Sequence, residues 1–148
     1  MKNLFTSLLL LSAITCFSQK EHNKILKSID ANLNKYEKIA QEIWSFAEMG
    51  YQEEKSSNLL QKTLKFEGFQ VSKGVAGIPT AFVATYGSGT PVIAILGEYD
   101  ALPGLSQKAV PYKSSNNGKA GHACGHHLFG TASAAAAIAI KKYIENGK

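Results

Sequence analysis

Arginine is absent from this chain of 148 residues, and all sixteen of its basic residues are lysines. Without a guanidinium group, the chain has no bidentate clamp for the carboxylate or phosphate of a ligand. The net charge is +5, yet the lysines are spread along the chain, with one adjacent pair at 141–142. A nucleic-acid-binding surface clusters its basic residues and favours arginine. We therefore expect a solvated surface and no nucleic-acid partner.

Cysteine is nearly as scarce, since Cys16 and Cys124 are the only two in the sequence. Residues 1–18 are typical of a secretory signal peptide, with a positive start, an apolar centre and a polar run after Ser18. The segment is too short for a membrane span. We expect a secreted or periplasmic protein. A lipoprotein anchored at Cys16 is the alternative, which Thr15 disfavours.

Cys124 lies within residues 121–127, which also hold three of the four histidines of the chain. After removal of the signal peptide it has no cysteine to pair with, and an unpaired thiol in an oxidising compartment must be buried, reactive or ligated. Imidazole nitrogen and thiolate sulfur are ligands that zinc prefers. The pattern favours a metal site, and the alternative is a surface loop that happens to be rich in histidine.

The spacing of apolar residues predicts a single α/β domain with three helices and at least three strands. The expected helices cover residues 25–49, 56–67 and 128–146, the first ending at Gly50 and the second capped by Gly68. Short strands are expected over residues 69–71 and 80–86, joined by a glycine-rich turn. The continuous apolar run 92–96 predicts a strand that is buried on both faces at the centre of a sheet.

Two acids, Glu98 and Asp100, follow this run, and Asp100 is one of only two aspartates in the chain. Ligand sites in open α/β sheets lie just beyond the carboxyl ends of the strands, where side chains at i and i+2 point the same way. The alternative is that both acids only cap a loop. A helix dipole after residues 121–127 favours the thiolate of Cys124. Oxygen, nitrogen and sulfur donors together suit a catalytic divalent metal that activates water against a carbonyl.

Residues 98–103 and 122–126 resemble the metallo-amidohydrolases related to aminoacylases and zinc carboxypeptidases, in the branch of p-aminobenzoyl-glutamate hydrolase. Residues 46–53, 74–80 and 97–107 carry the same likeness. The resemblance implies an α/β/α sandwich of zinc-peptidase type and a small-molecule substrate, an N-acyl or N-aroyl amino-acid amide. It also implies zinc or manganese as cofactor, with two ions in the complete enzyme, and a homo- or hetero-oligomer.

The resemblance also implies roles for individual residues. Cys124 and His126 match the family's metal ligands, and Asp100 matches a supporting acid near the metals. Glu98 falls where other branches place a ligating histidine, so it is a further candidate metal ligand. His127 stands where the hippurate-hydrolase branch has an aspartate and is not expected to bind metal, and His122 is expected to be structural or to support the ligands.

The family's general-base glutamate, its remaining ligands and its lid domain lie downstream of the corresponding helix. Here the only acid after Asp100 is Glu145, and no histidine follows His127. We therefore expect residues 19–148 to be the N-terminal portion of a catalytic domain, inactive alone and with an exposed, aggregation-prone sheet edge. Two alternatives remain, namely a non-enzymatic secreted zinc-binding module and a secreted interaction domain.

Overall fold

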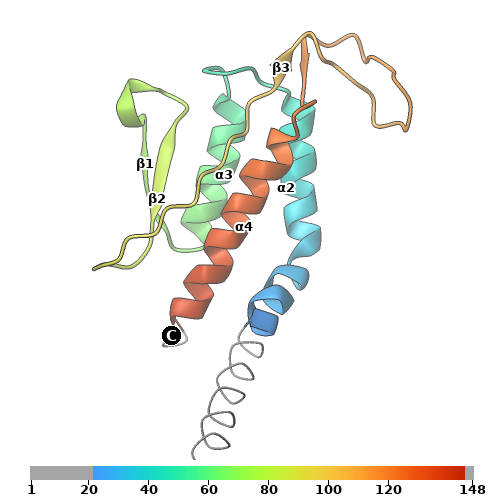
Figure 1. Cartoon of the computed structure of the whole chain (residues 1–148). Helices are drawn as coiled ribbons and strands as arrows, with labels where there is room; N and C mark the ends of the chain where they lie inside the picture. Colours follow the sequence, from blue (N-terminus) through green and yellow to red (C-terminus); the bar gives the residue numbers. More distant parts are fainter. Residues whose placement is uncertain (1–21, 146–148) are drawn as a thin grey trace, which may run out of the picture.

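A computed structural model describes residues 22–145, so the predicted signal peptide and Cys16 lie outside the described residues. Three helices lie side by side (Figure 1), namely α2 (Leu33–Phe46), α3 (Glu54–Phe66) and α4 (His126–Glu145). Two antiparallel pairs of strands accompany them, β1 (Gln70–Lys73) with β2 (Phe82–Thr85) and β3 (Leu102–Pro103) with β4 (Ala120–Gly121). A short 3-10 helix, η1 (Val75–Gly77), connects β1 to β2. This mixture of helices and strands confirms the predicted α/β class.

The first predicted helix is interrupted. Residues 22–30 are helical, and α2 starts only after Asn32, whose side-chain amide donates to Ser28 O at 2.8 Å. An asparagine that bonds its own backbone competes with the helical pattern, which explains the break. The prediction that Gly50 ends this helix is also wrong. Ala47 closes it in the left-handed conformation (φ 45°), and its N–H donates to Ile43 O.

The second predicted helix and the hairpin after it are confirmed. Gly68 follows α3 with φ 87°, a left-handed conformation that glycine adopts without strain. The chain then enters β1, which pairs with β2 in a register that places Val71 opposite Ala84. In Figure 1 the hairpin lies beside α3. The glycine-rich segment between the two strands is a connector, as predicted.

The core lies where α2, α3 and α4 meet, and one face of each helix supplies it. Ile43 is fully buried and Ile138 is 1% exposed. The buried residues of this core are Tyr36, Ile39, Ile43, Leu60, Leu64, Phe69, Ala134, Ala135 and Ile138. Small alanines on α4 let the neighbouring helices approach it closely, so α4 holds its first turn, with His126, at a defined place.

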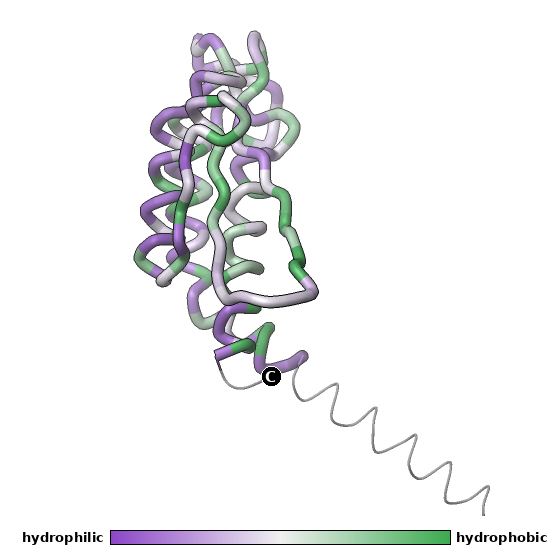
Figure 2. The backbone as a smooth tube through the Cα atoms, turned by 90° about the vertical axis from the view of Figure 1, so that its left-hand side faces the viewer, coloured by the Kyte–Doolittle hydropathy of each residue, from purple (hydrophilic) through white to green (hydrophobic). Residues whose placement is uncertain are grey.

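The expectation of a central buried strand over residues 92–96 is wrong for the described residues. The segment is extended but belongs to no strand, and the side chains of Val92, Ile93 and Leu96 are 84%, 79% and 81% exposed. A strand needs a hydrogen-bonded neighbour, and within residues 22–145 the strands form only the pairs β1–β2 and β3–β4. Figure 2 shows the segment as an apolar stretch of extended chain.

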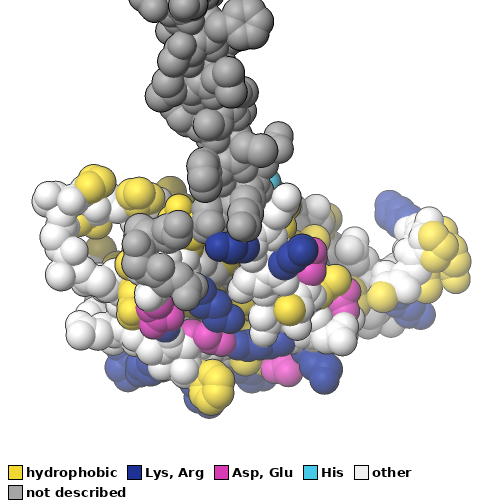
Figure 3. Space-filling model, turned by 90° about the horizontal axis from the view of Figure 1, so that it is seen from below, with side chains coloured by type: hydrophobic (Ala, Val, Ile, Leu, Met, Phe, Trp, Pro, Cys, Tyr) yellow, Lys and Arg dark blue, Asp and Glu magenta, His cyan; other side chains and the backbone are white. Residues whose placement is uncertain are grey.

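The surface carries charges of both signs. At the end of the molecule seen in Figure 3, lysine and acidic side chains lie intermingled. None of the helices within residues 22–145 is both long and apolar enough to cross a membrane.

Candidate metal centre

The segment that carries Glu98 and Asp100 passes between α4 and the start of α3. The N–H of Ala101 donates to Glu48 O at 2.7 Å, which fixes the end of the segment beside the chain that follows α2. On the other side it packs against α4 so closely that a Cβ at Gly130 would lie 2.7 Å from Glu98 O. The segment is therefore held between α4 and the chain that follows α2.

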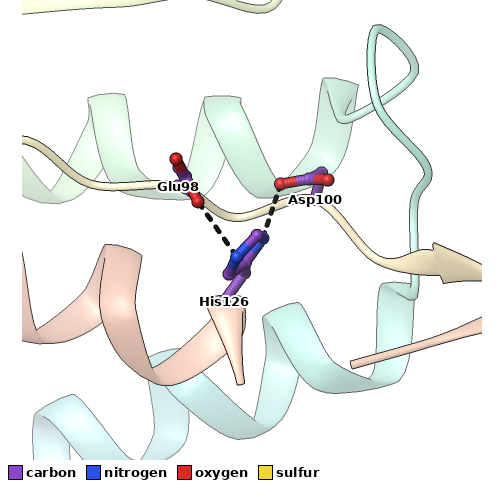
Figure 4. Close-up of side chains that lie close together, drawn as sticks. All are labelled: Glu98, Asp100 and His126. Atoms are coloured by element: carbon purple, nitrogen blue, oxygen red, sulfur yellow. Dashed lines mark hydrogen bonds and ion pairs between the residues drawn. The ribbon is translucent and has the colours of Figure 1, made fainter. Parts of the chain in front are cut away.

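His126 lies at the first residue of α4 and points at both acids. Gly125, with φ 83°, turns the chain into the helix. His126 Nδ1 lies 2.7 Å from Asp100 Oδ1, and His126 Nε2 lies 2.9 Å from Glu98 Oε2 (Figure 4). The two acids come from one extended segment and converge on one imidazole ring, as their i, i+2 spacing predicts.

The three side chains differ in their exposure to solvent, which increases from His126 to Asp100 to Glu98. Their exposed fractions are 18% for His126, 30% for Asp100 and 62% for Glu98. An ionised carboxylate only accepts hydrogen bonds, so an N–H at Nδ1 of His126 is directed at Asp100 and an N–H at Nε2 is directed at Glu98. Glu98, the most exposed of the three, lies on the open side of the cluster.

These donors can hold a divalent ion. One ligand atom from each of Glu98, Asp100 and His126 lies within 4.8 Å of the others. Carboxylate oxygen and imidazole nitrogen are ligands shared by zinc and manganese sites. A histidine that binds metal through one nitrogen commonly donates its other N–H to a carboxylate, which is the arrangement of His126 and Asp100.

Cys124 is not part of this cluster. Its thiol is free and exposed, two residues before α4. The sequence pattern placed Cys124 among the metal ligands, and the structure brings together Glu98, Asp100 and His126 in its place. The role of Cys124 stays a prediction.

His122 and His127 lie behind the cluster and face the core. His122 is 3% exposed, and its Nε2 lies 3.0 Å from Ile43 O, so it connects the loop before α4 to α2. The two rings are 5.0 Å apart, and both Nδ1 atoms are buried without a hydrogen-bond partner among the described residues. Burial lowers the pKa of His122 and of His127 below the ordinary value, so both are neutral at pH 7.

Tyr99 is a residue that the sequence reasoning missed. It stands between the two acids, points away from His126, and donates its hydroxyl to Thr80 O at 2.6 Å. Burial raises the pKa of Tyr99 above its ordinary value, so the hydroxyl keeps its proton. The alternation of side chains along residues 98–100 is the one sequence signal that could have indicated this inward direction.

Known hydrolases resemble this chain over most of its length. No protein-family model matches the chain. One subunit of the p-aminobenzoyl-glutamate hydrolase of Escherichia coli (strain K12) is 46% identical over 129 residues, which cover 86% of this chain and 27% of that protein. Xaa-Arg dipeptidase of Mus musculus is 30% identical over 128 residues, covering 80% of this chain and 26% of that protein. The chain is related to the metallo-amidohydrolases.

A further relative is thermostable carboxypeptidase 1 of Saccharolobus solfataricus, 36% identical over 90 residues, which cover 60% of this chain and 22% of that protein. The relatives are a hydrolase, a dipeptidase and a carboxypeptidase by name, so the predicted hydrolase class is confirmed for the family. The chain spans about a quarter of the length of the curated relatives it matches.

Proposed function

We propose that this chain supplies part of the metal centre of a hydrolase that cleaves N-acyl or N-aroyl amino-acid amides of the aminobenzoyl-glutamate kind. The observation that carries the proposal is the convergence of Glu98 and Asp100 on His126. The 46% identity to the Escherichia coli p-aminobenzoyl-glutamate hydrolase chain supports the substrate class.

The donor set fits a divalent ion. His126 Nε2 and a Glu98 oxygen face the solvent side and would hold the ion, and Asp100 would orient the ring through Nδ1. The chemistry that a bound zinc or manganese ion supplies in such a site is activation of water and polarisation of the amide carbonyl. With Asp100 against Nδ1, an ion that replaces the direct contact between Nε2 and Glu98 would be held by both of these groups.

The described residues bring together only three donors, and a centre for two ions needs more. We therefore expect the 148-residue chain to bind one divalent ion weakly and to show no measurable turnover alone. The test is to purify the full chain, add excess zinc or manganese, and assay hydrolysis of aminobenzoyl-glutamate. Robust turnover would contradict the expected inactivity. Tight stoichiometric zinc binding with cooperative folding and no turnover would favour a zinc-binding module instead.

Cys124 is proposed as a further metal ligand because only Gly125 separates it from His126 in the sequence and because its thiol is free. Cobalt(II) bound by a thiolate gives a sulfur-to-metal charge-transfer band in the near ultraviolet. We expect this band in the chain loaded with cobalt and its loss in Cys124→Ser. If the two spectra are identical, Cys124 is not a ligand and the centre uses Glu98, Asp100 and His126 alone.

We also propose that the protein is exported through its first eighteen residues. N-terminal sequencing of the protein expressed in a bacterial host with a periplasm should then begin at Gln19. Incorporation of a fatty acid, lost in Cys16→Ser, would instead establish a lipoprotein.

A further inference from the structure

Tyr99 and the acids beside it point to opposite sides of one extended segment. Glu98 and Asp100 face His126 (Figure 4). The half-buried Tyr99 side chain lies against Phe82 of β2 and Thr80. Its ring stacks on Phe82 with centroids 6.1 Å apart and an interplanar angle of 24°. Its hydroxyl donates to Thr80 O at 2.6 Å. The segment is thus attached to the hairpin by the one side chain that lies between the two acids.

The acceptor of that hydrogen bond is itself fixed. Thr80 is 6% exposed, and its hydroxyl donates to the buried carboxylate of Glu53 at 2.8 Å. Ser57 Oγ donates to the same carbonyl, Thr80 O, at 2.6 Å, and Gln61 donates to Ser57 Oγ at 2.9 Å. A buried network of satisfied polar groups is rigid, so Tyr99 is held by a fixed point.

The acids have no comparable anchor of their own. Among the described residues, the hydrogen bonds and ion pairs of the Glu98 and Asp100 carboxylates go to His126 alone. Their positions relative to His126 therefore depend on the backbone of the segment, which is fixed by Tyr99 and by the bond from Ala101 N to Glu48 O.

We propose that Tyr99 is a positioning residue for the metal centre, whose hydroxyl and ring set the place of Glu98 and Asp100 against His126. The expected effect of Tyr99 on metal binding rests on the proposed metal function. Its effect on the orientation of the His126 ring can be tested without a metal. Loss of the Tyr99 hydroxyl lets the segment shift, and the Asp100 carboxylate then no longer holds the His126 ring in one orientation.

The test compares Tyr99→Phe, which keeps the ring and removes the hydroxyl, with a matched control in the full chain. Tyr86→Phe removes a tyrosine hydroxyl that donates to Glu145 at 3.0 Å, away from the network around Thr80. Removing groups that orient a metal ligand commonly lowers metal affinity by 10- to 100-fold. We expect roughly tenfold weaker cobalt(II) binding and an altered visible spectrum for Tyr99→Phe, and wild-type values for Tyr86→Phe.

The same variants are compared without metal by nitrogen-15 NMR of the imidazole rings. In the wild type, the His126 nitrogens should show fixed shifts set by Asp100 at Nδ1 and Glu98 at Nε2, and Tyr99→Phe should show averaged nitrogen shifts. Wild-type ring shifts in a folded Tyr99→Phe chain would overturn the inference, as would equal losses in Tyr86→Phe. If the wild type binds no cobalt, the proposed metal function fails, and the metal-free spectra still decide the role of Tyr99. Tyr99→Trp, which keeps an aromatic ring and an N–H donor, serves as the second variant if Tyr99→Phe does not fold.

Discussion

At the scale of the residue, the orientation of the His126 ring decides how well the centre can bind a metal. Asp100 lies 2.7 Å from Nδ1, where it can accept a hydrogen bond, so Nε2 is the nitrogen that would bind the ion. Asp100→Asn should weaken zinc binding about tenfold because it keeps an acceptor but removes the charge, and Asp100→Ala about a hundredfold. Isothermal titration calorimetry measures both. Wild-type affinity in Asp100→Ala would show that the ring needs no such support.

The pH dependence of stability offers a second prediction at this scale. His122 has its pKa lowered by burial, with His126 lowering it further and Asp100 opposing the shift. A histidine whose pKa is lower in the folded chain than its unfolded value of about 6.5 stabilises the fold fully above that pH. The contribution is lost as the pH falls from about 6.5 toward the folded value, since the unfolded chain binds the proton first.

His122→Gln tests this, because glutamine does not titrate and its amide can still donate to Ile43 O. Urea unfolding at a series of pH values between about 7.5 and 5 should show a smaller loss of stability for the variant than for the wild type. The neighbouring His127 has a lowered pKa for the same reason, so some dependence should remain. An unchanged pH profile would show that His122 is not the titrating group.

At the scale of the element, the close approach of α4 to the segment with the acids is the critical contact. Gly130 lies on α4 one turn after His126, and a Cβ there would lie 2.7 Å from Glu98 O and 3.2 Å from Tyr99 Cβ. In an ordinary helix, glycine to alanine gains about 1 kcal/mol. Here the clash should reverse the sign, and overpacking of this kind costs about 1–3 kcal/mol.

Gly130→Ala should therefore both destabilise the chain and weaken metal binding. Thermal unfolding and a zinc titration measure the two effects, with Ile140→Ala, an exposed position of the same helix, as the control. A more stable Gly130→Ala chain with normal zinc affinity would mean that the segment does not press on α4.

The elements that the sequence predicts correctly depend on local pattern. Helix α3, the cap at Gly68 and the β1–β2 hairpin follow from apolar spacing and glycine positions within short windows. The interruption at Asn32 depends on which hydrogen bond one side chain chooses, so periodicity cannot reveal it. Residues 92–96 have the composition of a buried strand, but burial is a property of neighbours and not of the segment.

The sequence likewise predicts the local features of the site but not its contacts with distant segments. The spacing of Glu98 and Asp100 and the position of His126 before a helix predict that they meet, and they do. Their attachment through Tyr99 to Thr80 joins segments nineteen residues apart and cannot be derived from spacing.

At the scale of the whole molecule, the exposed apolar run 92–96 is the surface feature that favours association with other molecules. Ile93 and Leu96 are 79% and 81% exposed on the same stretch, and contiguous apolar surface of this kind promotes association. Ile93→Lys should reduce light scattering and dye binding at a given protein concentration without lowering the melting temperature. Leu33→Lys, at an isolated apolar residue that is 50% exposed, is the control and should change neither. Equal effects from both variants would show that added charge alone is responsible.

His126 and the two acids beside it form the proposed divalent metal centre. Calorimetry can follow zinc binding to the full chain in the wild type, in His126→Ala and in His22→Ala, an exposed histidine far along the sequence from the site. We expect one ion per chain in the wild type and His22→Ala, and at least about a hundredfold weaker binding in His126→Ala. Equal zinc binding in all three chains, or none in the wild type, would contradict it.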